Sequence, residues 1–318
     1  MAQTIADIRA RLEQADDQTF PTLQRSLAGD TRKGVQVLLR KTEARLERER
    51  AERERLRALY AFDASWHERN GGLVLGMDEV GRGPLAGPLT VAAVVFGQEA
   101  LADGAPLVEG LNDSKQIAEQ SRPAIAQSVK EQALAWTIVH VEPQRIDQDG
   151  MTACLRHAFT EAISRIDAQL AQASQQGQGA RQCQAAKQGR VASIVTQQGQ
   201  GTPSLASAVV GSAVEPAAED CVRTVLLDGN PMHLDPREVS VVKGDARSAS
   251  IAAASVIAKV ARDALMVEYD AQYPGYDFAA SKGYGSARHR EAIQRQGLSP
   301  IHRTSFCQGI LQVQGSLF

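Results

Sequence analysis

The sequence lacks the residue patterns that mark several classes of protein. Its four cysteines are widely spaced, with no CxxC pair and no Cys/His ligand pattern, which argues against a zinc site and a disulfide framework. No apolar run approaches the length of a membrane span, and the acid-containing N-terminus lacks the apolar core of a secretory signal. We therefore expect a soluble, cytoplasmic protein with free thiols and no membrane contact.

Strong net charge and the common nucleophile motifs are also missing. The formal net charge is -2, so the chain as a whole does not attract nucleic acid, and such binding would need a local basic surface. There is no GxSxG, no Cys/His pair and no nucleotide-binding glycine fingerprint. None of the six histidines has the spacing of a metal ligand. These absences remove covalent catalysis and dinucleotide binding from the leading interpretations.

The clearest functional pattern in the chain lies between residues 73 and 96. Its two ends, residues 73–77 and 89–96, are short apolar runs that predict β-strands. Asp78 and Glu79 directly follow the first run, at the position where α/β sheets carry their chemistry. The glycines and prolines of GRGPLAGP, between the two runs, predict a fixed turn that can approach a ligand closely.

Two later strand-like runs also end at an acid. Residues 223–227 precede Asp228, and residues 238–242 lead to Asp245, while a further strand is predicted at 135–141. If these strands lie side by side, the ends on one edge of the sheet converge, and the acids form a cluster. Clustered carboxylates repel one another unless a cation neutralises them, and hard oxygen ligands favour magnesium or manganese.

Helices are predicted between and after the strands, with Pro123 tolerated only in a first turn or at a kink. Residues 172–212 are rich in glutamine and glycine and contain neither an acid nor an aromatic residue. Such a segment buries too little apolar surface to offset the entropy of ordering it, so we expect a disordered insertion. The predicted helices are approximately 116–133, 150–171, 246–273 and 286–296.

Residues 1–72 predict a helical N-terminal extension. Residues 40–60 mix positive and negative charges at helical spacing and carry little apolar stripe. The simplest interpretation is a solvated helix, and the alternative is an arm whose arginines lie along nucleic-acid phosphates. The arginines concerned are Arg45, Arg48, Arg53, Arg55 and Arg57.

The string GMDEVGRGPLAGP closely resembles the opening motif of ribonuclease HII, the type 2 ribonuclease H. Further matches follow in that family's order over residues 73–307, interrupted by the insertion, which is the main departure from the family pattern. The segment DTRKGVQVLLRK also resembles an N-terminal extension of some bacterial members. The further matches are LNDSK at 111–115, LLDGN at 226–230, VVKGD at 241–245, IAAASVIAKVARD at 251–263, YPGY and KGYG within 273–285, and IHRTSF at 301–306.

This resemblance implies a ribonuclease H-like α/β fold, in which a five-stranded mixed sheet is flanked by helices. The small helical N-terminal extension would occupy residues 1–72, and the catalytic domain residues 73–307. The disordered insertion at 172–212 would interrupt that domain, and residues 308–318 would form a polar tail.

The resemblance also implies an endonuclease that hydrolyses RNA in RNA–DNA hybrids and cuts 5′ to ribonucleotides embedded in duplex DNA, leaving a 5′-phosphate. Its partners would be these two nucleic acids, and its cofactor Mn2+ or Mg2+. It assigns Asp78, Glu79, Asp228 and Asp245 as the catalytic acids, and the first three also as metal ligands. Two ions held by such acids would activate water and stabilise the leaving 3′ oxygen in an in-line displacement.

Substrate-binding residues are expected on the same grounds. The GRG turn would read the 2′-hydroxyl, LNDSK would lie near the substrate backbone, and the KGYG tyrosine would lie against the neighbouring sugar. These residues are Gly81, Arg82, Gly83, Ser114, Lys115 and Tyr284.

Three alternatives stay open. Asp263 competes with Asp245 as the fourth acid, although an ion pair with Lys259 or Arg262 is its simpler role. The chain could instead be a non-catalytic nucleic-acid-binding protein that uses the charged helical arm, although all four acids are present. It could also be a nuclease of the same superfold that acts on DNA alone, which the GRG turn and Tyr284 oppose by resemblance.

Overall fold

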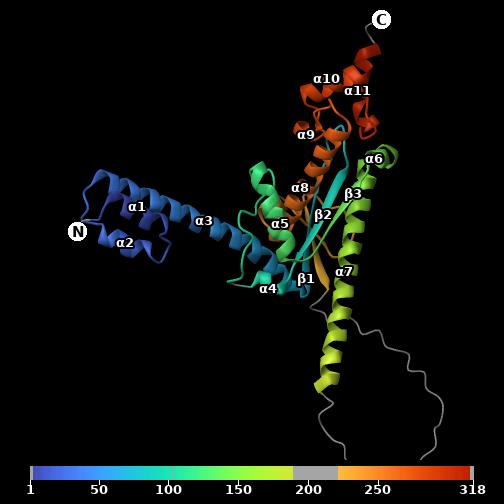
Figure 1. Cartoon of the computed structure of the whole chain (residues 1–318). Helices are drawn as coiled ribbons and strands as arrows, with labels where there is room; N and C mark the ends of the chain where they lie inside the picture. Colours follow the sequence, from blue (N-terminus) through green and yellow to red (C-terminus); the bar gives the residue numbers. More distant parts are fainter. Residues whose placement is uncertain (1–2, 103, 189–220, 316–318) are drawn as a thin grey trace, which may run out of the picture. The chain divides into compact units, whose positions relative to one another are not determined.

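The computed structural model of the chain describes residues 3–102, 104–188 and 221–315. The chain divides into two compact units, residues 1–59 and 60–318, and Figure 1 follows it through both. Among the residues described, no helix combines the length and the apolar character needed to cross a membrane.

The first unit is helical, as the sequence predicts. Helix α1 (Ile5–Glu13) begins at a capping box, in which the side chain of Thr4 accepts the backbone N–H of Asp7. Helices α2 (Phe20–Ser26) and the first part of α3 (Lys33–Asn70) complete it. The short apolar patches of the sequence pack together here into a small core of their own. Its buried members are Ile8, Leu12, Ala15, Phe20, Leu27, Val35, Leu39 and Leu46.

Several arginines of α3 form ion pairs inside this first unit. Arg45 pairs with Glu49, and both Arg50 and Arg53 bind Asp17. Exposed pairs of this kind contribute little to stability, but they neutralise part of the positive charge on this surface. This use of the arginines favours the solvated-helix interpretation, and the phosphate-binding arm stays a prediction.

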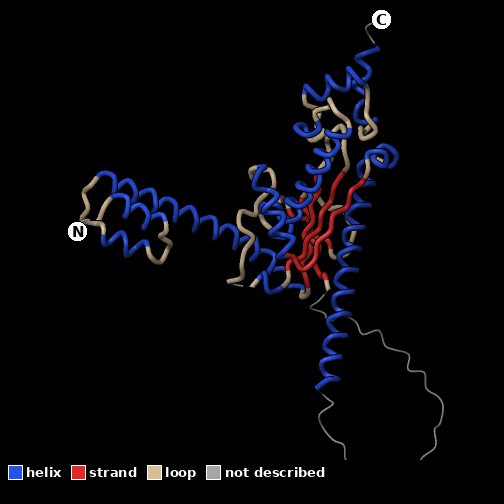
Figure 2. The backbone as a smooth tube through the Cα atoms, in the orientation of Figure 1, coloured by secondary structure: helices blue, strands red, loops and turns tan. Residues whose placement is uncertain are grey.

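The second unit is built on a mixed five-stranded sheet in the order β3-β2-β1-β4-β5 (Figure 2). Strands β1, β2 and β3 pair in antiparallel fashion, whereas β4 and β5 run parallel to β1. The five predicted strands are confirmed. However, β1 continues two residues beyond Asp78, so Asp78 and Glu79 lie within the last residues of this strand. The strands are β1 (Leu73–Val80), β2 (Leu89–Phe96), β3 (Ala133–Val141), β4 (Val222–Asp228) and β5 (Glu238–Val241).

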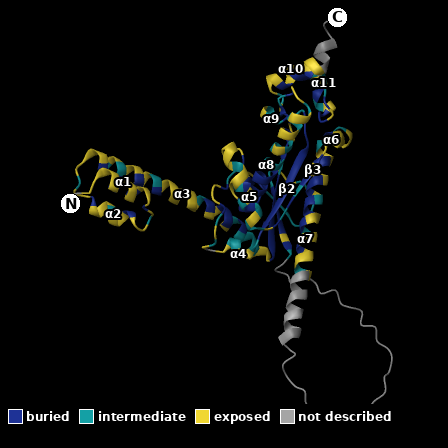
Figure 3. Cartoon of the chain, viewed as in Figure 1, coloured by how far each residue is buried: buried dark blue, intermediate teal, exposed yellow. Residues whose placement is uncertain are grey.

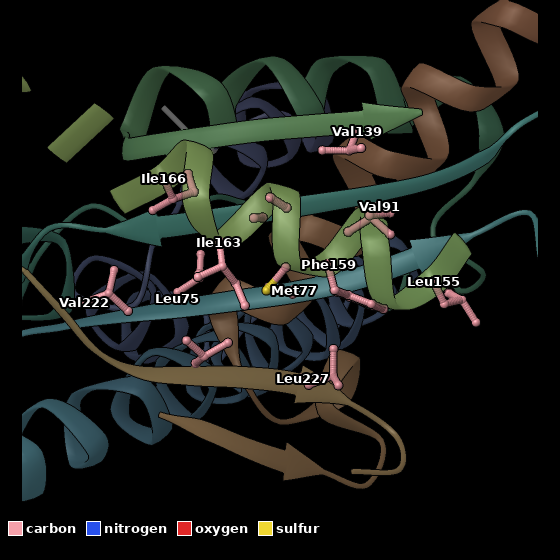
Figure 4. Packing of buried hydrophobic residues seen from close by; sticks show 14 of the residues in the cluster. Leu75, Met77, Val91, Val139, Leu155, Phe159, Ile163, Ile166, Val222 and Leu227 are labelled. Atoms are coloured by element: carbon pink, nitrogen blue, oxygen red, sulfur yellow. The ribbon is translucent and has the colours of Figure 1, made fainter. Parts of the chain in front are cut away.

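Helix α7 (Met151–Gln188) covers one face of this sheet. Phe159 and Ile163 of the helix pack with Leu75 and Met77 of β1 in a single apolar cluster (Figure 4). Strands β1, β2 and β4 are buried along most of their length, as the dark blue of β2 in Figure 3 illustrates, whereas β3 and β5 are buried only in part. Burying each such side chain stabilises the fold by about 1.5–3 kcal/mol relative to leaving it exposed.

The length of α7 corrects part of one prediction. The helix continues to Gln188, so residues 172–188 are helical where the sequence predicts disorder. Glutamine and alanine are good helix formers, and the extension of an existing helix avoids the cost of nucleation. The remainder of the predicted insertion, residues 189–212, lies outside the described residues.

Helix α8 (Ala249–Gln272) lies against the opposite face, where its small residues allow close packing. A Cβ atom on Gly76 of β1 would come closer than 3.0 Å to the backbone of Ser250, so only glycine permits this approach. Phe62 and Trp66, from the last turns of α3, pack on the same face of the sheet. The end of α3 therefore belongs to the second unit.

The remaining helices are short and connect or cap the main layers. Pro123 lies in the first turn of α5, as predicted. The predicted tail at 308–318 is corrected as far as the structure describes it, because α11 runs to Gly315. The carboxylate of Asp147 accepts the first backbone N–H groups of this helix. The helices are α4 (Gln98–Leu101), η1 (Glu119–Ser121), α5 (Arg122–Gln132), α6 (Pro143–Asp149), η2 (Gly244–Ala246), α9 (Phe278–Ser281), α10 (Ala287–Gln296) and α11 (Thr304–Gly315).

Candidate active site

Two of the predicted acids meet because β1 and β4 are parallel neighbours. Met77 pairs with Leu227 in the register of these strands, so Asp78 and Asp228 come next at the same end of the sheet. Parallel strands direct equivalent ends to one edge, which is where open α/β sheets bind their ligands. The pairing of distant segments thus converts two separate sequence motifs into one acidic site.

Asp78 is buried, with 9% of its surface exposed. Burial raises its pKa well above the ordinary value, and the negative charges of Glu79 and Asp228 raise it further. The backbone N–H of Glu79, which donates to Asp78 Oδ1 at 2.8 Å, acts in the opposite direction. The pKa of Glu79 is also raised by burial, although Arg82 Nη1 lies 3.1 Å from its Oε1 and opposes that shift.

The loop after β5 brings the fourth acid to the same place. Lys243 adopts a left-handed conformation with φ 55°, and the following Gly244 donates its N–H to Asp228 Oδ1 at 2.6 Å. Asp245 then lies in the short helix η2. Burial raises the pKa of Asp245, and the charges of Asp113 and Asp228 add to the shift.

Lys115 and Asp113 complete the electrostatic surroundings. Burial acts to lower the pKa of Lys115, but the carboxylates of Asp113 and Asp245 outweigh it, and its pKa is raised. Lys115 is exposed beside the acids, which suits the predicted contact with the substrate backbone. Asp113 is a nearby acid that the sequence reasoning missed, although it stands inside the LNDSK motif. The hydroxyl of Ser114 points inward and accepts a hydrogen bond from Ser255 at 2.9 Å.

The donor set at this edge suits a hard divalent cation. Within the described ranges, no three His, Cys, Asp or Glu side chains are already gathered closely enough to enclose a metal ion. The acids instead have other partners, such as Arg82 for Glu79 and the Gly244 N–H for Asp228. However, all the donors are carboxylate oxygens, and their mutual repulsion raises the pKa of Asp78. Both properties fit magnesium or manganese.

The predicted nucleotide-reading residues form an exposed rim beside the acids. Gly81 is buried, whereas Arg82 and Gly83 are exposed at the tip of the turn. Tyr284 is 45% exposed on a second loop. The two loops are joined because the backbone N–H groups of residues 85 and 86 both donate to the carbonyl of Gly283. The structure therefore brings the GRG turn and Tyr284 together on one surface.

A pair of buried histidines supports the Tyr284 loop from below. The N–H of Ser299 donates to His302 Nδ1 at 2.9 Å, so the proton of this ring lies on Nε2. That Nε2–H can donate to His289 Nε2 at 3.1 Å, and His289 Nδ1–H can donate to the Tyr284 carbonyl at 2.8 Å. Burial lowers the pKa of both rings, to about 4 for His302, so both are neutral at pH 7. Neither ring faces the acids, in agreement with the absence of a metal-ligand pattern.

Asp263, the competing acid, is engaged elsewhere. Its carboxylate lies 2.8 Å from Lys259 Nζ and 4.0 Å from Arg122 Nη1. This ion pair is the simpler role considered from the sequence. Asp245 therefore has the better position for the fourth acid of the site.

The comparison of the whole sequence with known families shows which family the chain belongs to. The family profile described as ribonuclease HII matches residues 75–309, and the profile described as the ribonuclease HII N-terminal domain matches residues 4–67. The chain belongs to the ribonuclease HII family. It is therefore a ribonuclease H, a nuclease that acts on the RNA of RNA–DNA hybrids. The second match shows that the helical extension is itself a family element.

Solved structures of ribonucleases H2 and HIII have a similar fold. The crystal structure of ribonuclease H2 from Pyrococcus horikoshii OT3 has a TM-score of 0.52 at 18% identity, and the match covers 77% of this chain and 99% of that one. The crystal structure of Bst ribonuclease HIII in complex with Mn2+ has a TM-score of 0.51 at 15% identity, covering 80% of this chain and 73% of that one. At such identities the similarity shows the ribonuclease H-like fold alone.

Proposed function

We propose that this ribonuclease HII cleaves RNA–DNA hybrids and also duplex DNA that contains a single ribonucleotide. The cut falls on the 5′ side of the ribonucleotide and leaves a 5′-phosphate on it. The reaction depends on Mg2+ or Mn2+ held by Asp78, Glu79 and Asp228, with Asp245 as the fourth catalytic acid. The observation that carries the proposal is the convergence of Asp78 and Asp228 at one end of two parallel strands.

The acids have the properties that this role needs. Asp78 is buried next to two other carboxylates, an arrangement that disfavours its charged form until a cation is near. When bound, a pair of divalent ions in such a site supplies activated water and stabilises the leaving 3′ oxygen. The protein's own contribution is to hold the carboxylates in place. The Gly244 N–H fixes the carboxylate of Asp228, and the backbone N–H of Glu79 donates to Asp78 Oδ1 at 2.8 Å.

Substrate positioning falls to the exposed residues around the acids. Lys115 offers a positive charge beside them, where a phosphate of the cleaved strand would lie. The exposed tip at Arg82 and Gly83 adjoins Glu79, so the 2′-hydroxyl of the ribonucleotide can be read by this turn. Tyr284 presents its ring to the neighbouring sugar from the second loop.

A cleavage assay with three matched duplexes tests this proposal. The same labelled sequence is prepared as all DNA, as DNA with one ribonucleotide, and as an RNA–DNA hybrid, each with and without Mg2+. We expect cleavage of the last two only, and only with metal, with the 5′ cut mapped by product length. Equal cleavage of the all-DNA duplex would identify a DNA nuclease. Binding without cleavage under every metal condition would identify a binding protein.

Tyr284→Ala separates discrimination from simple binding. This change is expected to lower cleavage at the single ribonucleotide much more than it lowers duplex binding, because the ring contacts only the nucleotides next to the cut. Measured affinity and turnover on the same duplex decide the point. Equal losses in binding and cleavage would show that the tyrosine serves only as a general contact.

A further inference from the structure

Two arginines lie completely buried beneath the nucleotide-reading surface. Arg262 on α8 and Arg303, just before α11, each have 0% of their surface exposed. A buried cation usually has a carboxylate partner, because an unpaired charge in the interior is costly. In the described part of the chain neither guanidinium forms an ion pair with an acid. Their hydrogen bonds go to backbone carbonyl oxygens instead.

Arg303 binds both ends of the GRGPLAGP turn, residues 81–88. Its Nη2 donates to the carbonyl of Gly81 at 2.6 Å and to that of Gly87 at 2.8 Å, and its Nη1 donates to the carbonyl of Arg82 at 3.0 Å. One planar side chain therefore clamps the start and the end of the turn. The exposed tip of the turn is held between these anchored ends.

Arg262 joins the same turn to the tyrosine loop. Its Nε donates to the carbonyl of Pro88 at 2.9 Å and its Nη2 to that of Ala86 at 3.1 Å. Its Nη1 donates to the carbonyl of Lys282 at 2.9 Å, in the second loop. The guanidinium carbon also lies 6.0 Å from the centre of the Tyr284 ring, within the range of a cation–π contact.

The glycines of the two loops match this packing. A Cβ atom on Gly81 would come closer than 3.0 Å to Arg262, and one on Gly283 would come equally close to the carbonyl of Ala86. By contrast, no described atom lies within 4 Å of a Cβ built on Gly83. Internal packing therefore requires glycine at 81 and 283, whereas the space beside Gly83 is open to a ligand.

We propose that Arg262 and Arg303 are positioning residues that set the selectivity for a single ribonucleotide. They do so by holding the GRGPLAGP turn and the Tyr284 loop as one rigid reading surface. This inference rests on the proposed function of that surface. The 2′-hydroxyl is one small group, so the backbone that recognises it must be held in one fixed position. Neither arginine touches the substrate.

The guanidinium group of arginine is well suited to hold the two loops together. The five donors of arginine lie in one plane on three nitrogen atoms, so they reach carbonyl oxygens on different sides of the group, whereas the three donors of lysine all leave a single nitrogen atom. Burial lowers the pKa of Arg303 to about 10, with Arg262 adding to the shift, and burial also lowers the pKa of Arg262. Both side chains stay protonated at neutral pH and keep all their donors.

Arg262→Lys and Arg303→Lys test the proposal, because they keep the charge and lose the planar fork. For each variant, kcat and KM are measured on the single-ribonucleotide duplex and on a continuous RNA–DNA hybrid. The expected loss of kcat at the single ribonucleotide is about tenfold larger than the loss on the hybrid, with little change in KM. The hybrid tolerates a displaced turn because it offers many successive cleavage positions.

Arg237→Lys is the matched control. Arg237 is partly buried and bonds the carbonyl of Val222 and the carboxylates of Asp167 and Asp235, away from both loops. Its replacement by lysine should lower the thermal midpoint but leave the ratio of the kcat values on the two substrates unchanged. If Arg262→Lys and Arg303→Lys lose activity equally on both substrates, the two arginines have only a structural role and the inference is overturned.

A measurement on the wild-type chain covers the case in which the lysine variants do not fold. The side-chain Nε–H resonances of Arg262 and Arg303 are followed by NMR in metal-free protein during titration with two duplexes. We expect the single-ribonucleotide duplex to shift them and the all-DNA duplex of the same sequence to leave them nearer their free positions. Identical spectra would overturn the inference. Failure of the wild type to cut the single-ribonucleotide duplex would instead overturn the proposed function.

Discussion

At the scale of single residues, the chain buries charge in two opposite ways. Asp78 is a buried acid among other acids, and burial and Glu79 raise its pKa. Arg262 and Arg303 are buried cations whose donors are satisfied by backbone carbonyl oxygens. The first arrangement favours the binding of a cation from solution. The second fixes the backbone, because each bond ties a loop carbonyl to one rigid group.

Asp78→Asn and Asp228→Asn are each expected to reduce cleavage by more than about a hundredfold, since each removes a proposed metal ligand. The fold should remain intact, and the thermal midpoint in the absence of metal should be unchanged or higher, because one of several crowded negative charges is gone. Turnover at saturating Mg2+ and thermal unfolding measure the two effects.

Asp263→Asn is the control for these two variants. Its carboxylate pairs with Lys259, so the change should lower stability while cleavage persists. Near-normal turnover of either Asp78→Asn or Asp228→Asn would refute the assignment of the metal site. Complete loss of turnover in Asp263→Asn would reopen the choice of the fourth acid.

Gly83→Ala and Gly81→Ala should have different consequences, although the glycines are two residues apart. The space beside Gly83 is open among the described atoms, so alanine there should fold normally and lower single-ribonucleotide cleavage by about tenfold or more by blocking backbone approach. Gly81 has φ 92° and lies against Arg262, so alanine there should destabilise the protein itself. Thermal midpoints and cleavage rates distinguish these outcomes. An unstable Gly83→Ala variant would contradict the open space.

At the scale of elements, the C-terminal helices act as a support for the Tyr284 loop. His289, on α10, bonds the Tyr284 carbonyl, and His302, just before α11, bonds His289. Both rings pack against the aromatic rings of Tyr276 and Phe278. The support depends on neutral rings, because protonation of either histidine would place two donors where the chain needs one donor and one acceptor.

This arrangement predicts a pH-dependent stability. The folded pKa of His302 is lowered to about 4 by burial and by His289, so its contribution is complete above about pH 6.5, the ordinary pKa of the unfolded chain. As the pH falls from 6.5 through 4, the unfolded state binds the proton more readily and this stability is lost. The free energy of unfolding from urea titrations at several pH values measures the effect.

The variant His302→Gln should be less stable than the wild type at pH 7.5 but should lose less stability between pH 6.5 and 4. The pH dependence of the free energy of unfolding must be compared between the variant and the wild type. The reason is that Asp63 contributes to this free energy with the opposite dependence on pH. Burial raises the pKa of Asp63 to about 6, so its contribution is complete below about pH 3.8 and is lost as the pH rises through 6. If the free energy of unfolding changed with pH in the same way in His302→Gln and in the wild type, this role of the histidine would be excluded.

At the scale of the whole molecule, the boundary between the two units falls inside helix α3. The predicted boundary follows residue 72, but the compact units divide between Leu59 and Tyr60. The hydroxyl oxygen of Tyr60 accepts the N–H of Val108 at 3.2 Å. Asp63 accepts hydrogen bonds from Ser248 and Ser250, at the start of α8. These contacts make the last turns of α3 part of the catalytic unit.

Deletion of residues 1–59 should therefore leave a folded nuclease, whereas deletion of residues 1–68 should not. The longer deletion removes the buried ring of Tyr60 and the partly buried rings of Phe62 and Trp66, and the loss of a buried aromatic residue alone costs about 3 kcal/mol or more. Urea unfolding and cleavage of the hybrid compare the two truncations. Equal stability of both would show that the end of α3 is dispensable.

The shorter truncation also tests the helical arm. If the arginines of α3 contact phosphate, binding of a duplex by the truncated chain should be weaker and less sensitive to salt than binding by the full chain. An unchanged salt slope would support the solvated-helix interpretation, in which the ion pairs with Glu49 and Asp17 use up part of the positive charge.

Local patterns in the sequence were sufficient for much of this protein. Apolar runs of strand length predicted the five strands, and the motif around Asp78 and Glu79 pointed to the family that the profile match shows. These features are local because they depend on short apolar runs and on short motifs. The extent of α7 was missed because glutamine-rich composition indicates little burial, although it does not oppose the extension of a helix already formed.

Only the tertiary structure decided how distant segments meet. The parallel pairing of β1 with β4 brings Asp228 beside Asp78 across a sequence separation that no local pattern spans. Arg262 and Arg303 looked like ordinary charged residues, and their roles follow from carbonyl oxygens of loops far away along the chain. A buried guanidinium is stable only where folding supplies those acceptors, so its function is a property of the folded chain and not of its neighbours in sequence.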